Sequence, residues 1–170
     1  MLYPPERFDL NEWFSLLSGI VVFAAALLLP KRFSAVLTTV FVMFTLFISQ
    51  TVDALIAVEP VNLYDVSDTS KYEIMDAFIY YFVYPPTTYL FLYFYDRWKP
   101  GGWRRVLYVA GGSFVSVVLE GLAHWVRVYT YKGWNLGYSL CVYLVVYALY
   151  VWIYHLMIKL MDRQGIRTRR

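Results

Sequence analysis

Long apolar segments alternate with short polar segments along the whole chain. Five segments are apolar enough to be interpreted as helices that cross a membrane, and they cover about residues 13–29, 34–58, 74–95, 106–125 and 136–160. Each is close to the roughly 20 residues that a helix needs to cross the hydrocarbon core of a bilayer. The pattern predicts an all-α, polytopic membrane helical bundle that forms one domain over residues 1–170.

Polar and turn-forming residues mark where these helices begin and end. Asp9 and Asn11 precede the first segment as candidate caps, and Pro30 with two basic residues stops it. The turn that follows is short, so the first two helices are expected to be antiparallel neighbours. The stretch 59–73 is polar and acidic, and we expect a loop there.

Composition places the chain in lipid. Hydrophobic residues make up 60% of positions, aromatic residues 21% and charged residues only 16%, which is unlike an ordinary soluble domain. The net charge of +3 comes from short basic clusters beside the apolar segments. Such clusters are typical of topology determinants and do not indicate a nucleic-acid partner. A cleaved signal peptide is not expected, because the leader is acidic and the basic residues follow the first apolar segment.

The basic residues also predict an orientation, because cytoplasmic loops of membrane proteins collect Lys and Arg. With five crossings and the N-terminus outside, eleven basic residues fall inside: Lys31, Arg32, Arg97, Lys99, Arg104, Arg105, Lys159, Arg163, Arg167, Arg169 and Arg170. Four fall outside: Arg7, Lys71, Arg127 and Lys132. We therefore expect the N-terminus outside and the C-terminus inside.

Ionisable residues within the apolar segments are the strongest candidates for function, because a charge at the bilayer centre costs at least about 2.5 kcal/mol. Thr45, Ser49 and Asp53 share one helical face, and a second face repeats Gly112, Ser116, Glu120 and His124, with Arg127 one turn further. Two hypotheses remain open. The polar residues either form one pocket in the outer third of the membrane, or form an interhelical network that only fixes packing. The candidate pocket residues are Asp53, Asp76, Glu120, His124 and Arg127.

Pro85 and Pro86 interrupt the third segment. Each lacks an N–H group and frees a carbonyl one turn earlier, so the helix is expected to kink or break near Tyr84. Thr87 and Thr88 can compensate locally by binding the freed carbonyls. The alternative is a broken helix that lines a cavity, as in transporters, although such proteins usually show a second break in a matching half.

Sequence motifs for catalysis and metal binding are missing. The only two histidines, His124 and His155, are predicted near opposite membrane faces and so cannot share one metal ion. Cys141, in an apolar segment, is the single cysteine of the sequence, so the chain cannot form an intrachain disulfide. No nucleophile motif, phosphate loop or dinucleotide fingerprint occurs. We therefore expect no cofactor, no metal and no catalytic residue, and favour a protein that is not an enzyme.

Several short motifs together resemble a known family. Tyr84-Pro85, an aromatic run to Tyr93, Tyr95 and Asp96, an intramembrane Glu120, then Tyr131 and Trp134-Asn135 are similar to an uncharacterised family of small multispanning membrane proteins of spore-forming Firmicutes; Leu29-Pro30-Lys31-Arg32 fits it as well. The resemblance implies a bacterial plasma membrane or spore membrane. It implies no activity.

Three functions are compatible with these features. The first is a non-enzymatic envelope or spore-membrane component, which would act as the partner of another membrane protein or as a homo-oligomer. The second is a small oligomeric transporter or permeability factor for a proton, a cation or a small polar solute, using an outward-facing polar pocket. The third is a lipid-active membrane enzyme with Glu120 and His124 as acid and base, which lacks an accompanying nucleophile or metal.

Overall fold

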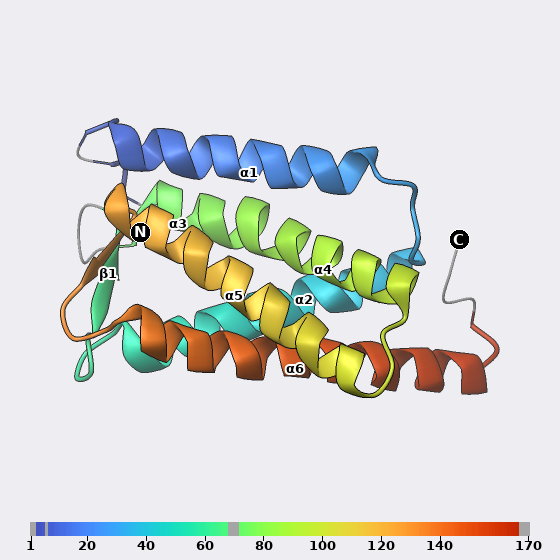
Figure 1. Ribbon diagram of the computed structural model, residues 1–170. Coiled ribbons are helices and arrows are strands. Elements are labelled where there is room, and N and C mark those ends of the chain that lie inside the picture. The colour runs from blue at the N-terminus through green and yellow to red at the C-terminus, as the bar shows by residue number, and fades with distance from the viewer. Residues whose placement is uncertain (1–2, 6, 68–71, 167–170) are drawn as a thin grey trace.

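The chain forms a bundle of long helices with a very small sheet at one end (Figure 1). The computed structural model describes residues 3–5, 7–67 and 72–166. Four helices are long: α1 (Leu10–Leu28), α2 (Ala35–Ile56), α5 (Trp103–Trp125) and α6 (Leu136–Arg163). Between them lies a continuous helical run of α3 (Ile74–Phe78), the π-helical turn η1 (Ile79–Val83) and α4 (Tyr84–Trp98). Two strands, β1 (Tyr64–Val66) and β2 (Tyr129–Tyr131), complete the described fold.

Helix α1 buries polar and small residues and exposes apolar ones, the reverse of a helix in a soluble bundle. On α1 the buried residues are Asn11, Glu12, Ser15 and Gly19, whereas large apolar side chains such as Leu17 are more than half exposed. In water such a surface would be an aggregation hazard, but in lipid it is the expected exterior. All four long helices are long and apolar enough to cross a bilayer. The chain is therefore an integral membrane protein, as the composition predicts.

The run from α3 to α4 lies in the middle of the bundle, between α1 on one side and α2 and α6 on the other (Figure 1). It is rich in Tyr and Pro, and it is the least apolar of the helical segments that were expected to cross the bilayer. Its neighbours explain this composition. Leu92, Tyr95 and Asp96 on α4 are almost completely buried, so they meet protein and not lipid.

Helix ends differ from the sequence expectations by a few residues, for local reasons. Ser34 caps α2 by accepting from the Leu37 amide at 3.3 Å, and Asn135 caps α6 by accepting from the amides of Gly137 and Tyr138. The third helix continues to Trp98, beyond the expected end near residue 95, and stops where Lys99 adopts a left-handed conformation. Exact helix ends depend on such contacts, which the hydrophobic pattern does not contain.

The expected loop 59–73 contains a strand. β1 pairs antiparallel with β2, so that Tyr64 lies opposite Tyr131 and Val66 opposite Tyr129. Each strand has only three residues and the two are far apart in sequence. No local pattern predicts such a pairing. The sheet ties the loop after α2 to the connection between α5 and α6.

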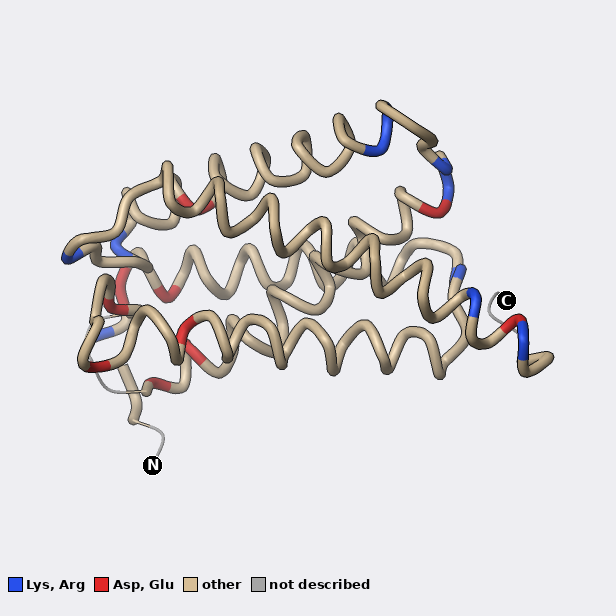
Figure 2. Tube along the Cα trace, turned by 90° about the horizontal axis from the view of Figure 1, so that it is seen from below, with Lys and Arg blue, Asp and Glu red and all other residues tan. Residues whose placement is uncertain are grey.

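The two ends of the bundle carry opposite net charge (Figure 2), although each also holds a few described residues of the other sign: Arg7, Arg127 and Lys132 at the sheet end, and Asp96 and Asp162 at the other end. We call the end that holds the C-terminus of α6 the basic end; its described basic residues are Lys31, Arg32, Arg97, Lys99, Arg104, Arg105, Lys159 and Arg163. We call the end that holds the sheet the acidic end; its described acidic residues are Asp9, Glu12, Asp53, Glu59, Asp65, Glu73, Asp76 and Glu120. The remaining basic residues of the predicted inner side, Arg167, Arg169 and Arg170, and Lys71 of the outer side, lie outside the described residues.

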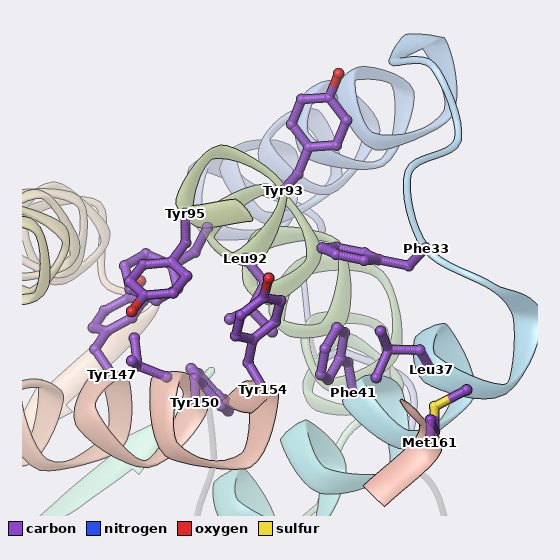
Figure 3. Packing of buried hydrophobic residues seen from close by; sticks show 12 residues of the cluster. Phe33, Leu37, Phe41, Leu92, Tyr93, Tyr95, Tyr147, Tyr150, Tyr154 and Met161 are labelled. Atoms are coloured by element: carbon purple, nitrogen blue, oxygen red, sulfur yellow. The ribbon is translucent and has the colours of Figure 1, made fainter. Parts of the chain in front are cut away.

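Aromatic side chains fill the half of the bundle nearest the basic end (Figure 3). Phe33, Phe41, Leu92, Tyr150 and Tyr154 meet between α2, α4 and α6. The Phe33 and Phe41 rings pack edge to face with centroids 5.3 Å apart, an arrangement that adds to the free energy of packing. We call the whole buried cluster the aromatic core, and it closes the bundle toward the basic end. Its members are Phe33, Leu37, Phe41, Phe91, Leu92, Tyr93, Tyr95, Tyr147, Tyr150, Val151, Tyr154 and Met161.

Candidate functional site

A cavity of about 390 Å³ lies in the other half of the bundle, toward the acidic end. All the long helices, the central helical run and both strands contribute to its wall. The wall is largely apolar and aromatic, and its polar side chains, apart from tyrosines, are Ser15, Ser18, Ser49, Asp53, Thr87, Thr88, Ser116, Glu120 and Ser139. We call this space the central cavity. A pocket of this size, mostly apolar with a few polar groups, is typical of a small-molecule site.

Asp53 is the first of two carboxylates on the cavity wall. It lies three residues before the end of α2, about 4.5 Å along the helix axis. Tyr64 of β1 and Tyr80 of η1 each donate a hydrogen bond to one of its carboxylate oxygens. Two long-range contacts therefore fix the Asp53 side chain against the sheet and the central helical run.

Glu120 is the second carboxylate. Tyr131 and Ser139 both donate to its Oε1 at 2.5 Å, and the Trp134 indole in turn donates to the Ser139 hydroxyl at 2.7 Å. Glu120 lies close enough to Asp53 for the two carboxylates to interact electrostatically. Both carboxylates thus line the cavity near the sheet, Asp53 from α2 and Glu120 from α5.

Tyrosines of the sheet act as hydrogen-bond donors to the carboxylates. The pKa of Tyr64 lies far above its ordinary value, mainly because the hydroxyl is buried and secondly because the Asp53 carboxylate is close. Burial and the hydrogen bond to Glu120 raise the pKa of Tyr131 in the same direction. Both hydroxyls therefore keep their protons at neutral pH. The hydroxyls therefore act as donors and hold the side chains of Asp53 and Glu120 in place.

His124 supports the site from outside the cavity. Its Nδ1 lies 2.7 Å from the Tyr129 carbonyl oxygen, and its ring stacks on Tyr131 at a centroid distance of 4.1 Å and an interplanar angle of 6°. The side chain is exposed and does not line the cavity. Its contacts hold Tyr131 in the position from which it donates to Glu120.

The structure brings together only part of the residue set selected from the sequence. Asp53 and Glu120 line the cavity. Asp76 is buried, but it accepts from the Ser67 hydroxyl at 2.7 Å and the Glu73 amide at 2.8 Å, and so caps the start of α3. Arg127 is exposed in a left-handed turn with φ 65°. Among the described residues, no ion pair joins Glu120 to His124 or Arg127.

Pro85 and Pro86 are accommodated by a π-helical turn and not by a gap in the helix. The turn η1 directly precedes Tyr84, and the prolines occupy the first positions of α4, where a missing N–H costs least. Thr87 donates from its side chain to the Val83 carbonyl at 2.7 Å, as expected from its spacing. The wider turn places Ile79, Val83 and Tyr84 on the cavity wall, in keeping with the frequent occurrence of π-turns at functional sites.

A buried ion pair at the basic end was not predicted from the sequence. Arg32, between α1 and α2, pairs with Asp96 at the end of α4, and Tyr154 of α6 donates to the same carboxylate. The Asp96 side chain is fully buried, and the Arg32 guanidinium lies 5.7 Å from the Tyr93 ring centroid. The pair joins positions 64 residues apart. The only sign of this ion pair in the sequence is Asp96 itself, an acidic residue that directly follows a run of aromatic residues.

The described residues contain no group of three His, Cys, Asp or Glu side chains that could hold a metal ion. Comparisons with protein-family models, with curated proteins and with solved structures find no match to the chain. The class of protein is therefore defined by its own fold, as a multi-pass integral membrane protein with a cavity between its helices.

Proposed function

We propose that the protein is a non-enzymatic membrane component that binds a small ligand in the central cavity. The cavity itself is the observation that supports this function, because it combines about 390 Å³ of space, a mostly apolar wall and two carboxylates held by tyrosines. The space is a partly open hollow between helices, since exposed side chains such as Val21 and Leu119 also line it. A space of this size between helices favours an occupant.

Binding is favoured over conduction because the cavity ends at the aromatic core. Tyr147 and Tyr150 line the cavity and also belong to that core. The second candidate, a small oligomeric transporter or permeability factor, is supported by the two carboxylates, but it would require the aromatic core to open. A lipid-active enzyme has the least support, since the described cavity wall contains no histidine beside its serines.

The proposed setting is a bacterial plasma membrane or spore membrane, as the resemblance to the family from spore-forming Firmicutes implies. As an envelope component, the protein could also bind a partner protein or a second copy of itself through its lipid-facing surface. The proposed path has five crossings, with α3 to α4 as the third, the N-terminus and the acidic end outside, and the basic end inside. Under this orientation the central cavity lies in the outer half of the membrane.

Cysteine labelling tests the orientation. In a Cys141→Ser background, single cysteines replace Val61, in the loop at the acidic end, and Gly101, in the loop at the basic end. A membrane-impermeant maleimide added to intact cells is expected to label Val61→Cys and to leave Gly101→Cys unlabelled until the cells are opened. The reverse pattern, or equal labelling of both, would contradict the proposed orientation.

Thermal stabilisation tests the proposed binding function. The purified protein is heated with a panel of cationic, anionic and neutral molecules small enough for the cavity. A ligand that binds only the folded state stabilises it by about 2.7 kcal/mol at 100 times its Kd, so at least one probe is expected to raise Tm by several degrees. If no probe of any charge raises Tm, the proposed function is wrong.

A further inference from the structure

The central cavity holds two acidic side chains, Asp53 and Glu120, and no basic one among the described residues of its wall. Their hydrogen bonds come from neutral hydroxyl groups. Elsewhere in the described chain, the buried Asp96 has the guanidinium of Arg32 as its counter-ion. The cavity carboxylates lack such a partner, and in a low-dielectric site a positive ligand would supply it.

The rest of the cavity wall suits an organic cation better than a metal ion. Aromatic rings line much of the space. They come from α1, the central helical run, both strands, the segment before α6 and α6 itself, and include Phe14, Tyr84, Tyr129, Trp134 and Tyr143. The face of an aromatic ring attracts a cation by about 0.5–2 kcal/mol, most strongly when both are removed from water. A Ca²⁺ or Mg²⁺ ion would need about six or more oxygen ligands, whereas the mostly apolar wall offers its surface to hydrocarbon groups.

A second hollow lies beside the cavity, on its lipid-facing side. A groove of about 500 Å³ lies between α4 and α5, and its wall is mostly apolar, with residues such as Leu90, Phe94 and Val115. Val115 is 57% exposed and so faces the surroundings of the bundle. Four residues line both hollows and form the boundary between them: Thr87, Ser116, Leu119 and Tyr147.

Side-chain contacts, and not close packing of α4 against α5, separate the groove from the cavity. At the basic end, Tyr108 of α5 donates to the Phe91 carbonyl of α4 at 2.7 Å. Nearer the cavity, the Ser116 and Tyr147 hydroxyls lie 2.7 Å apart. Leu119, the exposed member of this boundary, can rotate and widen the opening between groove and cavity without moving a helix, and rotations of exposed side chains are fast.

We propose that the ligand of the central cavity is a lipophilic organic cation, which enters from the bilayer through the groove between α4 and α5. The cationic group lies between Asp53 and Glu120, and the hydrocarbon groups lie against the aromatic wall. This inference rests on the proposed binding function and specifies its ligand class and route.

Two ions of similar shape and opposite charge test the ligand class. Tetraphenylphosphonium and tetraphenylborate are both membrane-soluble, and equilibrium dialysis with the purified protein gives a Kd for each. The phosphonium is expected to bind at least about tenfold more tightly, and Glu120→Gln is expected to remove most of this preference. Asp65→Asn is the matched control, because Asp65 is an acidic residue of the same end that does not line the cavity; it is expected to leave the Kd unchanged.

Folding is checked by Tm and size-exclusion chromatography for each variant. If Glu120→Gln fails to fold, Asp53→Asn gives the same test at the other carboxylate of the cavity. Equal binding of the two ions, or binding unchanged in the carboxylate variants, would overturn the ligand class while leaving the proposed binding function intact. If no probe of the thermal panel raises Tm, both the ligand class and the proposed binding function are wrong.

Association kinetics in nanodiscs test the route. Val115→Trp fills the groove, whereas Val118→Trp places the same bulk on α5 at an exposed position that lines neither hollow. The first variant is expected to slow phosphonium association at least about fivefold with little change in Kd, and the second to have no effect. Equal association rates in the two variants would overturn the lateral route.

Discussion

Replacing Arg32 by Met is expected to lower the free energy of unfolding by about 3–5 kcal/mol, because it leaves the buried Asp96 carboxylate without its counter-ion. Tyr154 still donates a hydrogen bond to Asp96, but a neutral hydroxyl does not replace a guanidinium. The pair also joins the α1–α2 connection to the end of α4. Unfolding in a detergent titration, followed by circular dichroism, measures the change.

Lys132 and Asp65 provide the matched control at the acidic end. Their ion pair has a distance of 2.8 Å, but the Lys132 side chain is 41% exposed, and an exposed pair contributes about 0–1 kcal/mol. Lys132→Met is therefore expected to change the free energy of unfolding little. Adding Asp96→Asn to Arg32→Met is expected to recover part of the loss. Equal destabilisation by Arg32→Met and Lys132→Met would contradict a buried, structurally important pair.

Replacing either of two valines of α6 by Phe is expected to change a different property: ligand affinity for Val142→Phe and stability for Val151→Phe. Val142 lines the central cavity, so Val142→Phe fills empty space and is expected to lower ligand affinity at least about thirtyfold with little effect on stability. Val151 is 6% exposed within the aromatic core. Val151→Phe is expected to cost about 1–3 kcal/mol through overpacking and to leave the Kd of a folded protein nearly unchanged.

The two substitutions add the same atoms to the same helix, so helix propensity does not distinguish them. Dialysis with tetraphenylphosphonium, or with another ligand found in the thermal panel, gives the Kd, and thermal unfolding gives the stability. A marked loss of stability in Val142→Phe, comparable to that in Val151→Phe, would show that the acidic half of the bundle is packed and holds no cavity.

The helices could be predicted from the sequence because lipid imposes a simple demand on each of them. An apolar segment of about 20 residues has few alternatives in a membrane protein, since its backbone groups must be satisfied within the helix. For α1 the same reasoning gives the wrong surface. Its apolar composition suggests a helix that is apolar on every side, but Asn11, Ser15 and Gly19 form the face that packs against the bundle. Residues that face protein in a membrane are often small or polar.

The site could be predicted only in part, because a helical face gives a direction but not a partner. The spacing of Ser116 and Glu120 placed both on one face, and both line the cavity. His124 and Arg127 continue that spacing, but α5 ends at Trp125 and the chain turns at Arg127. Tyr64 and Tyr131 could not be selected, although each lies only 11 residues from its carboxylate, since the pairing of β1 with β2 joins segments far apart in the sequence. Asp96 could not be selected because its partner Arg32 lies 64 residues away.

Anomalous scattering from a bound arsonium ion tests the central cavity as a binding site most directly. Tetraphenylarsonium has the shape and charge of the phosphonium, and its arsenic atom gives an anomalous peak in a crystal structure of the complex. The expected result is one arsenic peak inside the cavity, between Asp53 on α2 and Glu120 on α5. A peak only on the outer surface of the bundle, or side chains that fill the space between these two residues, would contradict the proposed site.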